Sequence, residues 1–137
     1  MTAATQDRDT REVPGRLRAY PLEAAAKIYG GTLACINAAG NLVKGITSAT
    51  LKCVGVAMQS YDNTAGAAGA ITGEVKTGVY GPFLNSAAAD LLADTDVGSD
   101  CYIVDDSTVA KTSAAATRSI AGRVWKVDAS GVWLKFS

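Results

Sequence analysis

From Arg16 onward the chain consists of short apolar or alternating runs that end at glycine or at Asn/Asp turns, and few stretches have helical spacing. Residues 32–36 form one such run, a turn follows at residues 37–41, and the chain returns through residues 42–44. Because Gly40 and Asn41 tolerate positive φ, this order predicts a β-hairpin. Many short strands with regular turns are typical of sandwiches and barrels. The sequence therefore predicts an all-β fold, either a jelly-roll-like sandwich or a small barrel.

Further strands are predicted by the same pattern at residues 16–20, 51–58, 71–79, 101–104, 108–111, 120–127 and 132–136. Strict alternation in residues 71–79 places Ile71, Val75 and Val79 on one face of a strand that Pro82 closes. The small, polar residues 61–70 are expected to form an exposed loop. At most one short helix is expected, at residues 85–93 with Ser86 as its cap, and an irregular loop would fit this segment equally well.

Residues 1–15 differ from the rest of the chain because they are polar, mixed in charge and almost free of large apolar side chains. Such a segment cannot bury enough surface to order itself, so we predict a flexible N-terminal arm. Residues 16–137 are predicted to form a single β domain. The arm is either a frayed terminus or an extension that binds a neighbouring subunit.

Charge gives little attraction to nucleic acid, because 13 lysines and arginines balance 13 aspartates and glutamates. The arginines near the N-terminus alternate with acidic residues, and no aromatic residue precedes Tyr20. This pattern differs from that of a nucleic-acid groove and suits pairing with mixed charges on a protein surface. The basic residues concerned are Arg8, Arg11, Arg16 and Arg18.

The chain has three cysteines and no histidine, which removes the commonest general base and most zinc chemistry. Cys35, Cys53 and Cys101 are far apart and flanked by apolar residues, so we interpret them as buried free thiols in a reducing compartment. A reactive or paired cysteine is the alternative. We expect no cofactor, no metal site and no enzymatic activity.

No signal peptide and no run long enough to cross a bilayer are recognised in the sequence. The N-terminal residues have no basic start followed by an apolar core. We therefore expect a protein made in a cytoplasm, without a membrane partner.

Two acidic stretches are candidates for chemistry. Asp105 and Asp106 lie between two predicted strands, where consecutive side chains point to opposite faces, so we interpret them as the tip of a hairpin rather than as an acid/base pair. Residues 94–100 hold Asp94, Asp96 and Asp100 at a spacing like that of a calcium loop, but without a closing glutamate. A solvated connection is the preferred interpretation.

Two tryptophans, Trp125 and Trp133, lie in the C-terminal part of the chain among bulky apolar residues. They predict either a core hairpin or a subunit interface, and both hold if opposite faces of the hairpin have different roles. The candidate interface residues are therefore Arg8, Arg11, Val13, Pro14, Arg16, Arg18, Tyr20, Trp125 and Trp133.

A series of motifs along the chain resembles the small capsid decoration, or cement, proteins of tailed bacteriophages. In order, the motifs are AAKIYGGTL at 25–33, NAAGN at 37–41, VGVA at 54–57, GAAG at 66–69, VKTGV at 75–79, DVGxxCYIVDDxTV at 96–109 and AGRVxxVDxxGVW at 121–133, where x is any residue. Proteins of this kind are encoded beside the major head protein in Mu-like and related phages. The motifs form a pattern of strands and turns without a catalytic signature.

The resemblance implies a β-rich, jelly-roll-like or barrel-like unit that binds the outer surface of the expanded capsid. Its partners would be the major capsid protein and further copies of itself, as a dimer or trimer at local symmetry axes. Its place would be the outside of the virion, after synthesis in the host cytoplasm. The alternative is a carbohydrate- or cell-surface-binding β module in which Tyr61 and Tyr80 stack on sugars.

Overall fold

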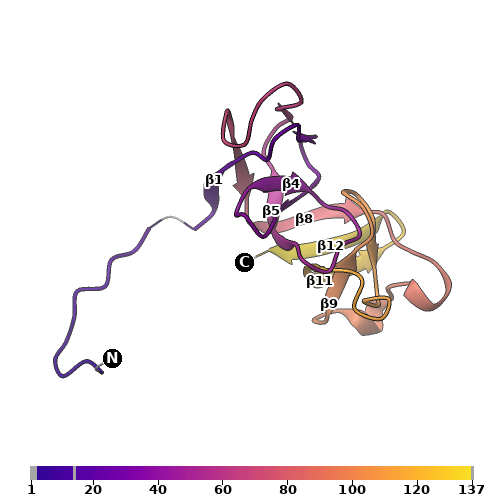
Figure 1. Ribbon diagram of the computed structural model, residues 1–137. Coiled ribbons are helices and arrows are strands. Elements are labelled where there is room, and N and C mark those ends of the chain that lie inside the picture. The colour runs from indigo at the N-terminus through magenta and orange to yellow at the C-terminus, as the bar shows by residue number, and fades with distance from the viewer. Residues whose placement is uncertain (1–2, 14, 137) are drawn as a thin grey trace.

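The computed structural model describes residues 3–13 and 15–136, and its ordered part is built from antiparallel β-sheets (Figure 1). Two five-stranded sheets and one two-stranded ribbon account for the named strands. Helical structure in the described residues is limited to two 3-10 turns, Ala88–Asp90 (η1) and Asp94–Asp96 (η2). The prediction of an all-β, sandwich-like fold is confirmed.

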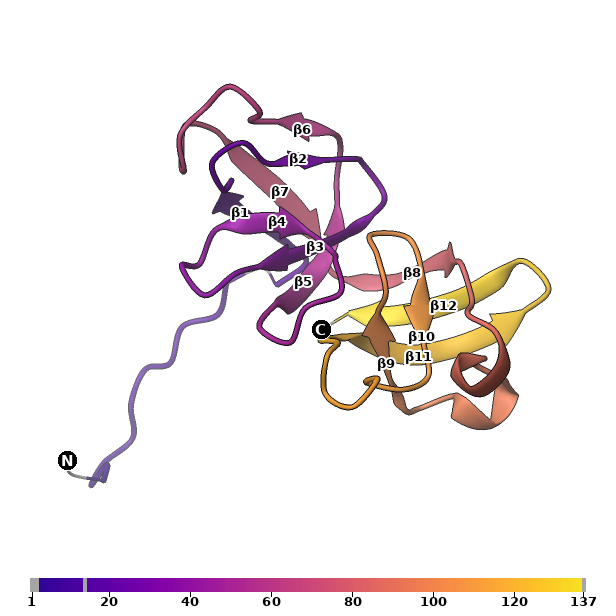
Figure 2. The same cartoon turned by 45° about the vertical axis from the view of Figure 1, so that its right-hand side comes forward.

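The first sheet is formed by the N-terminal part of the chain and has the strand order β1-β7-β5-β3-β4. The two-stranded ribbon, β2 with β6, lies at the end of this sheet that is remote from the second sheet (Figure 2). The strands are β1 Leu17–Pro21, β2 Lys27–Ile28, β3 Leu33–Ile36, β4 Leu42–Lys44, β5 Lys52–Ala57, β6 Tyr61–Asp62 and β7 Thr72–Lys76.

The second sheet begins only after the first is complete and has the strand order β10-β9-β11-β12-β8. Its longest strand, β11, pairs with β9 on one side and with β12 on the other, and bulges interrupt both ladders. The strands are β8 Gly78–Phe83, β9 Asp100–Ile103, β10 Val109–Ala110, β11 Ile120–Asp128 and β12 Gly131–Phe136.

Both large sheets curl strongly. A single bridge between Leu22 and Leu42 joins the ends of the first sheet, and one between Leu84 and Thr108 joins those of the second. Such curling follows from the right-handed twist of strands and from bulges. Neither sheet closes into a continuous barrel, so the sandwich is the better of the two predicted architectures.

The apolar side chains form two clusters. The larger one lies where the sheets face each other and combines Leu33 and Val56 of the first sheet with Ile103, Val124 and Leu134 of the second. The smaller one lies between the first sheet and the ribbon, with Leu22, Ile28 and Leu42 among its members. Burial of this surface is the main source of stability for a chain without disulfides.

Three local predictions need correction. The strand at 71–79 is two strands, because Gly78 has a φ of 132° and the chain changes sheet there. Pro82 does not end it, since β8 continues to Phe83. The loop predicted at 61–70 contains β6, which completes the ribbon.

The helix candidate at 85–93 is an irregular loop with one 3-10 turn, which is the alternative that the sequence left open. The Asn85 side chain holds the loop closed: its amide donates to the Leu92 carbonyl at 2.9 Å and its oxygen accepts from the Leu92 N–H at 3.0 Å. Ser86 does not cap a helix but donates to the carbonyl of Val109. So short a segment cannot repay the cost of nucleating an α-helix.

The hairpin predicted around Asp105 and Asp106 is confirmed. β9 and β10 pair antiparallel on either side of it, and Asp105 Oδ1 accepts from the Ser107 N–H at 2.9 Å. Burial raises the pKa of Asp105, but hydrogen bonds from Ser107 and Thr108 outweigh it and hold that pKa below its ordinary value. Cys101 and Ile103 are buried as predicted, whereas Tyr102 is only half-buried.

Candidate functional site

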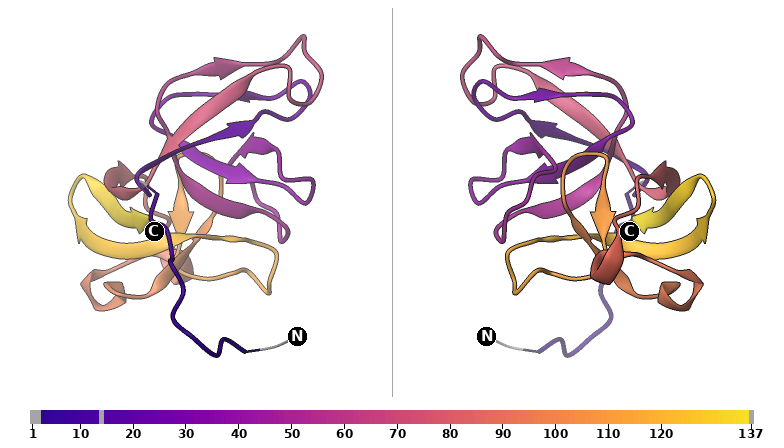
Figure 3. Two further views of the ribbon diagram at one scale, coloured as in Figure 1. Left: turned by 90° about the vertical axis from the view of Figure 1, so that its left-hand side faces the viewer. Right: turned by 90° about the vertical axis from the view of Figure 1, so that its right-hand side faces the viewer.

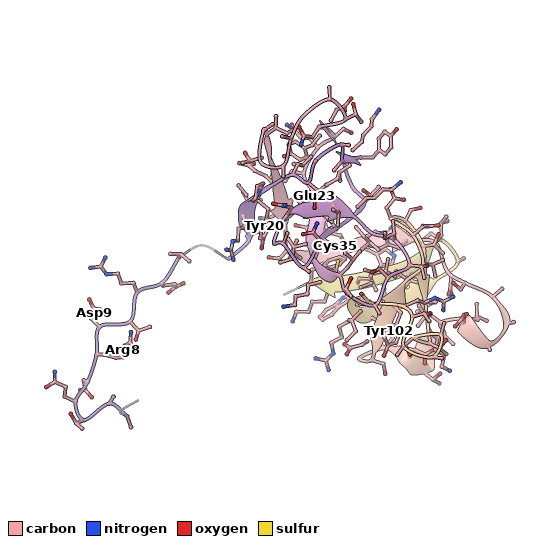
Figure 4. The ribbon with its side chains drawn as sticks, viewed as in Figure 1. Arg8, Asp9, Tyr20, Glu23, Cys35 and Tyr102 are labelled. Atoms are coloured by element: carbon pink, nitrogen blue, oxygen red, sulfur yellow. The ribbon has the colours of Figure 1, made fainter. Side chains whose placement is uncertain are left out.

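The N-terminal arm extends away from the body of the molecule (Figures 3 and 4). Residues 3–13 are all exposed and form no strand or helix, and 78% of the surface of Val13 is accessible. Arg8 and Arg11 make no ion pair with any other described residue. Pro14, also a candidate, lies outside the described residues. The arm therefore offers charged and apolar side chains that the body does not use.

Thr77 fixes the base of the arm at the junction between the sheets. Its N–H donates to the Arg16 carbonyl at 2.8 Å, and its hydroxyl donates to the Gly15 carbonyl at 2.9 Å. β1 then begins at Leu17 as an edge strand of the first sheet, paired with β7. The arm thus leads directly into a strand with one unpaired edge, which is where another chain can add a strand.

Arg18 and Tyr20 form one small cluster on β1. The Arg18 guanidinium lies 4.9 Å from the centre of the Tyr20 ring, a cation–π contact. Tyr20 is half-buried and packs against the smaller core cluster. Tyr20 is therefore partly a core residue, while Arg16 and Arg18 are exposed.

Trp125 is the outward-facing tryptophan. The ladder between β11 and β12 pairs Val124 with Leu134 and Lys126 with Trp133, so Trp125 is the extra residue of a bulge. It is 52% exposed and, with Val97, borders a hollow of about 370 Å³. Lys135 lies 5.7 Å from its ring centre. A half-exposed indole beside a cation is typical of a protein-binding anchor.

Trp133 belongs more to the interior. It is half-buried, with Lys126 at 4.8 Å from its ring centre, and its indole nitrogen is buried without a hydrogen-bond partner among the described residues. A Cβ at Gly81 would lie 3.0 Å from the Trp133 Cα, so β8 and β12 approach closely there. Of the two roles that the sequence predicted for the tryptophans, Trp133 therefore has that of a core residue, and Trp125 is the candidate for a subunit interface.

The predicted interface residues do not form one continuous site. The arm and β1 belong to the first sheet, whereas β11 and β12 carry the tryptophans in the second sheet (Figure 1). Two separate surfaces follow: the arm with the β1 edge, and the surface around Trp125.

A basic groove of about 720 Å³ was not foreseen from the sequence. It lies between the first and second sheets, and its lining includes Lys52, Arg118, Arg123 and Lys135 but only one carboxylate, Asp100. Arg118 is engaged by Asp90 at 3.2 Å, and Arg123 donates to the Gly98 carbonyl. These cations come from distant parts of the chain, so no sequence spacing could have indicated them.

The three cysteines gather in and beside the larger core cluster. Cys35 on β3 is directly opposite Cys53 on β5, and Cys101 on β9 belongs to the same cluster. Burial raises the pKa of Cys101 to about 12. Cys35 and Cys101 are buried free thiols, as expected, whereas Cys53 is only half-buried and lines the basic groove. Sequence alone could not place Cys35 against Cys53, because β4 lies between β3 and β5 in the chain and the local pattern does not show which strands pair.

Carboxylates elsewhere serve as local hydrogen-bond acceptors. In η2, Asp96 accepts from the Ala93 N–H at 2.8 Å and pairs with Lys111 at 3.6 Å. Across the described ranges, no group of three or more acidic, cysteine or histidine residues is arranged to hold a metal ion.

The two tyrosines proposed for sugar stacking form hydrogen bonds within the fold. Tyr61 accepts a hydrogen bond from the Glu74 N–H at 2.9 Å, and Tyr80 donates to the Thr77 carbonyl at 3.0 Å. Lys76 also lies 4.7 Å from the Tyr80 ring centre. Both rings therefore contribute to holding strands together.

Comparisons of this chain with protein-family models, with curated proteins and with solved structures give no match. Among the residues that the structure describes, no helix is both long and apolar enough to cross a membrane.

Proposed function

We propose that this protein is a structural component of a bacteriophage virion. As a dimer or trimer at local symmetry axes, it binds the outer surface of the expanded capsid and cements neighbouring subunits of the major capsid protein. The motifs that resemble decoration proteins suggest this class, and one structural observation supports it most: an exposed, charged arm joined to a firmly anchored edge strand.

The arm is suited to binding another protein chain. Asp7, Arg8, Asp9, Arg11 and Glu12 alternate in sign along an extended backbone whose N–H and C=O groups are free to pair. Such a segment can add a strand to a neighbour's sheet or lie in a shallow channel, gaining backbone hydrogen bonds without a deep pocket. Each exposed ion pair adds only about 0–1 kcal/mol, so the contact needs reinforcement.

Multivalency supplies that reinforcement. Once one subunit of an oligomer is bound to a capsid, the next contact forms at a high effective concentration, and avidity rises about 10²–10⁴-fold without any new kind of contact. The surface around Trp125 offers a second contact in each subunit, because a half-exposed tryptophan is a frequent hot spot. A capsid lattice presents the repeated sites that such a binder requires.

The arm can be tested by deletion of residues 1–13, which keeps the contact between Gly15 and Thr77. Because residues 3–13 are all exposed and belong to no strand or helix, the shortened protein should unfold at nearly the same temperature as the full chain. It should co-sediment with expanded heads at least tenfold more weakly. A matched control keeps the arm and replaces Asp7, Asp9 and Glu12 by the corresponding amides, which separates charge from backbone contacts.

Equal retention of the full-length and shortened proteins on the heads would contradict a role for the arm. Failure of the full-length protein to bind heads at all, together with specific binding to a glycan array, would favour the carbohydrate-binding alternative instead.

A further inference from the structure

Cys35 and Cys53 have the geometry of a cross-strand cysteine pair. They are register partners in the antiparallel ladder between β3 and β5, directly after a bulge at Val54. Directly opposite residues in such a ladder have Cα atoms about 4.5 or 5.5 Å apart, depending on the hydrogen-bonding position. Both values lie within the range of about 4.4–6.8 Å that a disulfide requires. Cys35 belongs to the core cluster between the sheets and Cys53 packs against that cluster, so the two side chains share one face.

The basic groove gives access to this pair from one side. Cys53 lines the groove, whereas Cys35 has no accessible surface. Lys52, Arg123 and Lys135 line the same groove, and their positive charge favours the binding of an anionic small molecule. Glutathione disulfide is such a molecule: it is small and carries a net negative charge at neutral pH.

We propose that Cys35 and Cys53 form a thiol–disulfide exchange site that reacts with anionic low-molecular-weight disulfides, glutathione disulfide being the model, which enter through the basic groove. The product is a disulfide that joins β3 to β5. This inference does not depend on the proposed role in a capsid.

The exchange takes two balanced steps. The Cys53 thiolate attacks one sulfur of glutathione disulfide, and the S–S bond breaks to release one glutathione thiolate. The Cys35 thiol then attacks Cys53 Sγ, its proton passes to the departing thiolate, and the second glutathione is released. Two cysteine thiols are oxidised, one disulfide is reduced, and the two protons end on the two glutathiones.

The order of attack follows from the environment of each thiol. A hydrogen bond from Cys35 lowers the pKa of Cys53, whereas the same contact and burial raise the pKa of Cys35. Cys53 is therefore the better nucleophile as well as the accessible one. Cys101 is not a register partner of Cys53: it lies opposite Gly122 in the ladder between β9 and β11, and its Sγ lies 3.5 Å from the Gly122 carbonyl.

Thiol counting and peptide mapping test the proposal. The full chain is incubated with glutathione disulfide, unfolded in denaturant and titrated for free thiols. We expect the number of thiols to fall from three to one, and mapping to show a Cys35–Cys53 peptide pair. Cys101→Ser is the matched control and should form the same disulfide. Cys35→Ser should stop at a mixed disulfide of Cys53 with glutathione, and Cys53→Ser should react at least tenfold more slowly.

The groove has its own test. Lys52→Glu with Lys135→Glu should slow exchange with glutathione disulfide at low salt about tenfold more than it slows exchange with uncharged hydroxyethyl disulfide, which reports any change in the reactivity of the Cys53 thiol itself. A disulfide that includes Cys101, three thiols remaining after prolonged oxidation, or equal reactivity of Cys53→Ser would overturn the proposal. If either variant fails to fold, direct mapping of the oxidised full chain still decides the pairing.

Discussion

At the scale of single residues, Gly55 shows how closely β5 and β7 approach each other. Its φ is +145°, and a Cβ at this position would lie 2.4 Å from the Lys76 carbonyl oxygen. The bulge at Val54 places the chain in this conformation. Only glycine fits, because the obstacle is backbone of the neighbouring strand rather than a movable side chain.

Gly55→Ala should therefore lower the free energy of unfolding by roughly 3 kcal/mol or more, since strain and a backbone clash act together. Gly40→Ala is the matched control, because Gly40 also has a positive φ, of +81°, but nothing within 4 Å of the added Cβ. It should cost only about 1 kcal/mol. Urea unfolding of both variants measures the difference, and equal costs would show that the close approach to Lys76 is absent.

Some residue-level features could be predicted from the sequence and others could not. The turn at Asp105 was predictable because the chemistry is local: an aspartate accepts hydrogen bonds from the residues that follow it. The opposition of Cys35 and Cys53 was not, because it depends on which strand lies beside β3 and on a bulge that shifts the register by one residue. Pairing between distant strands is a property of the whole sheet.

At the scale of elements, the bulge in β11 turns two consecutive side chains outward. Without the extra residue, successive side chains of β11 would alternate strictly between core and solvent. With it, Trp125, at 52% exposure, and Lys126 are both exposed, while Val124 is buried and Val127 is half-buried. Trp133 on the partner strand is half-buried beside Gly81. The sequence predicted the hairpin and singled out both tryptophans. It could not predict the bulge, because one extra residue in a strand is not recognisable in a pattern of apolar residues.

The two tryptophans should respond differently to truncation. Trp125→Ala should change the free energy of unfolding by less than about 1 kcal/mol while weakening binding to expanded heads about tenfold or more. Trp133→Ala should cost about 2–3 kcal/mol of stability, because it leaves a cavity between β8 and β12. Thermal unfolding and co-sedimentation of both variants separate the effects. A reversal, with Trp125 the more important for stability, would contradict the assignment.

The predicted strand boundaries were wrong where the chain passes from the first sheet to the second. Residues 71–79 have the pattern of one alternating strand, yet Thr77 separates β7 from β8, which begins at Gly78. Alternation alone does not distinguish one long strand from two strands in different sheets. β6 was missed for a related reason, since two residues are too few to produce any pattern.

At the scale of the whole molecule, the fold class was predictable and the surfaces were not. The turn-punctuated runs indicated an all-β protein, because turn chemistry and alternation repeat along the chain. The basic groove draws Lys52 from the first sheet and Arg123 and Lys135 from the second, so it exists only once the sheets pack. The arm was recognisable from composition, and the structure adds its attachment at Thr77 to the edge strand β1.

The central proposal is that this molecule binds the outside of a capsid through its arm and through multivalent contacts. Electron cryo-microscopy of expanded heads of a tailed bacteriophage, reconstructed with and without the added protein, tests it most directly. We expect additional density of this size on the outer surface at junctions between capsomers, with residues 3–13 ordered against a neighbouring subunit. Identical maps with and without the protein, at concentrations that saturate every site, would contradict it.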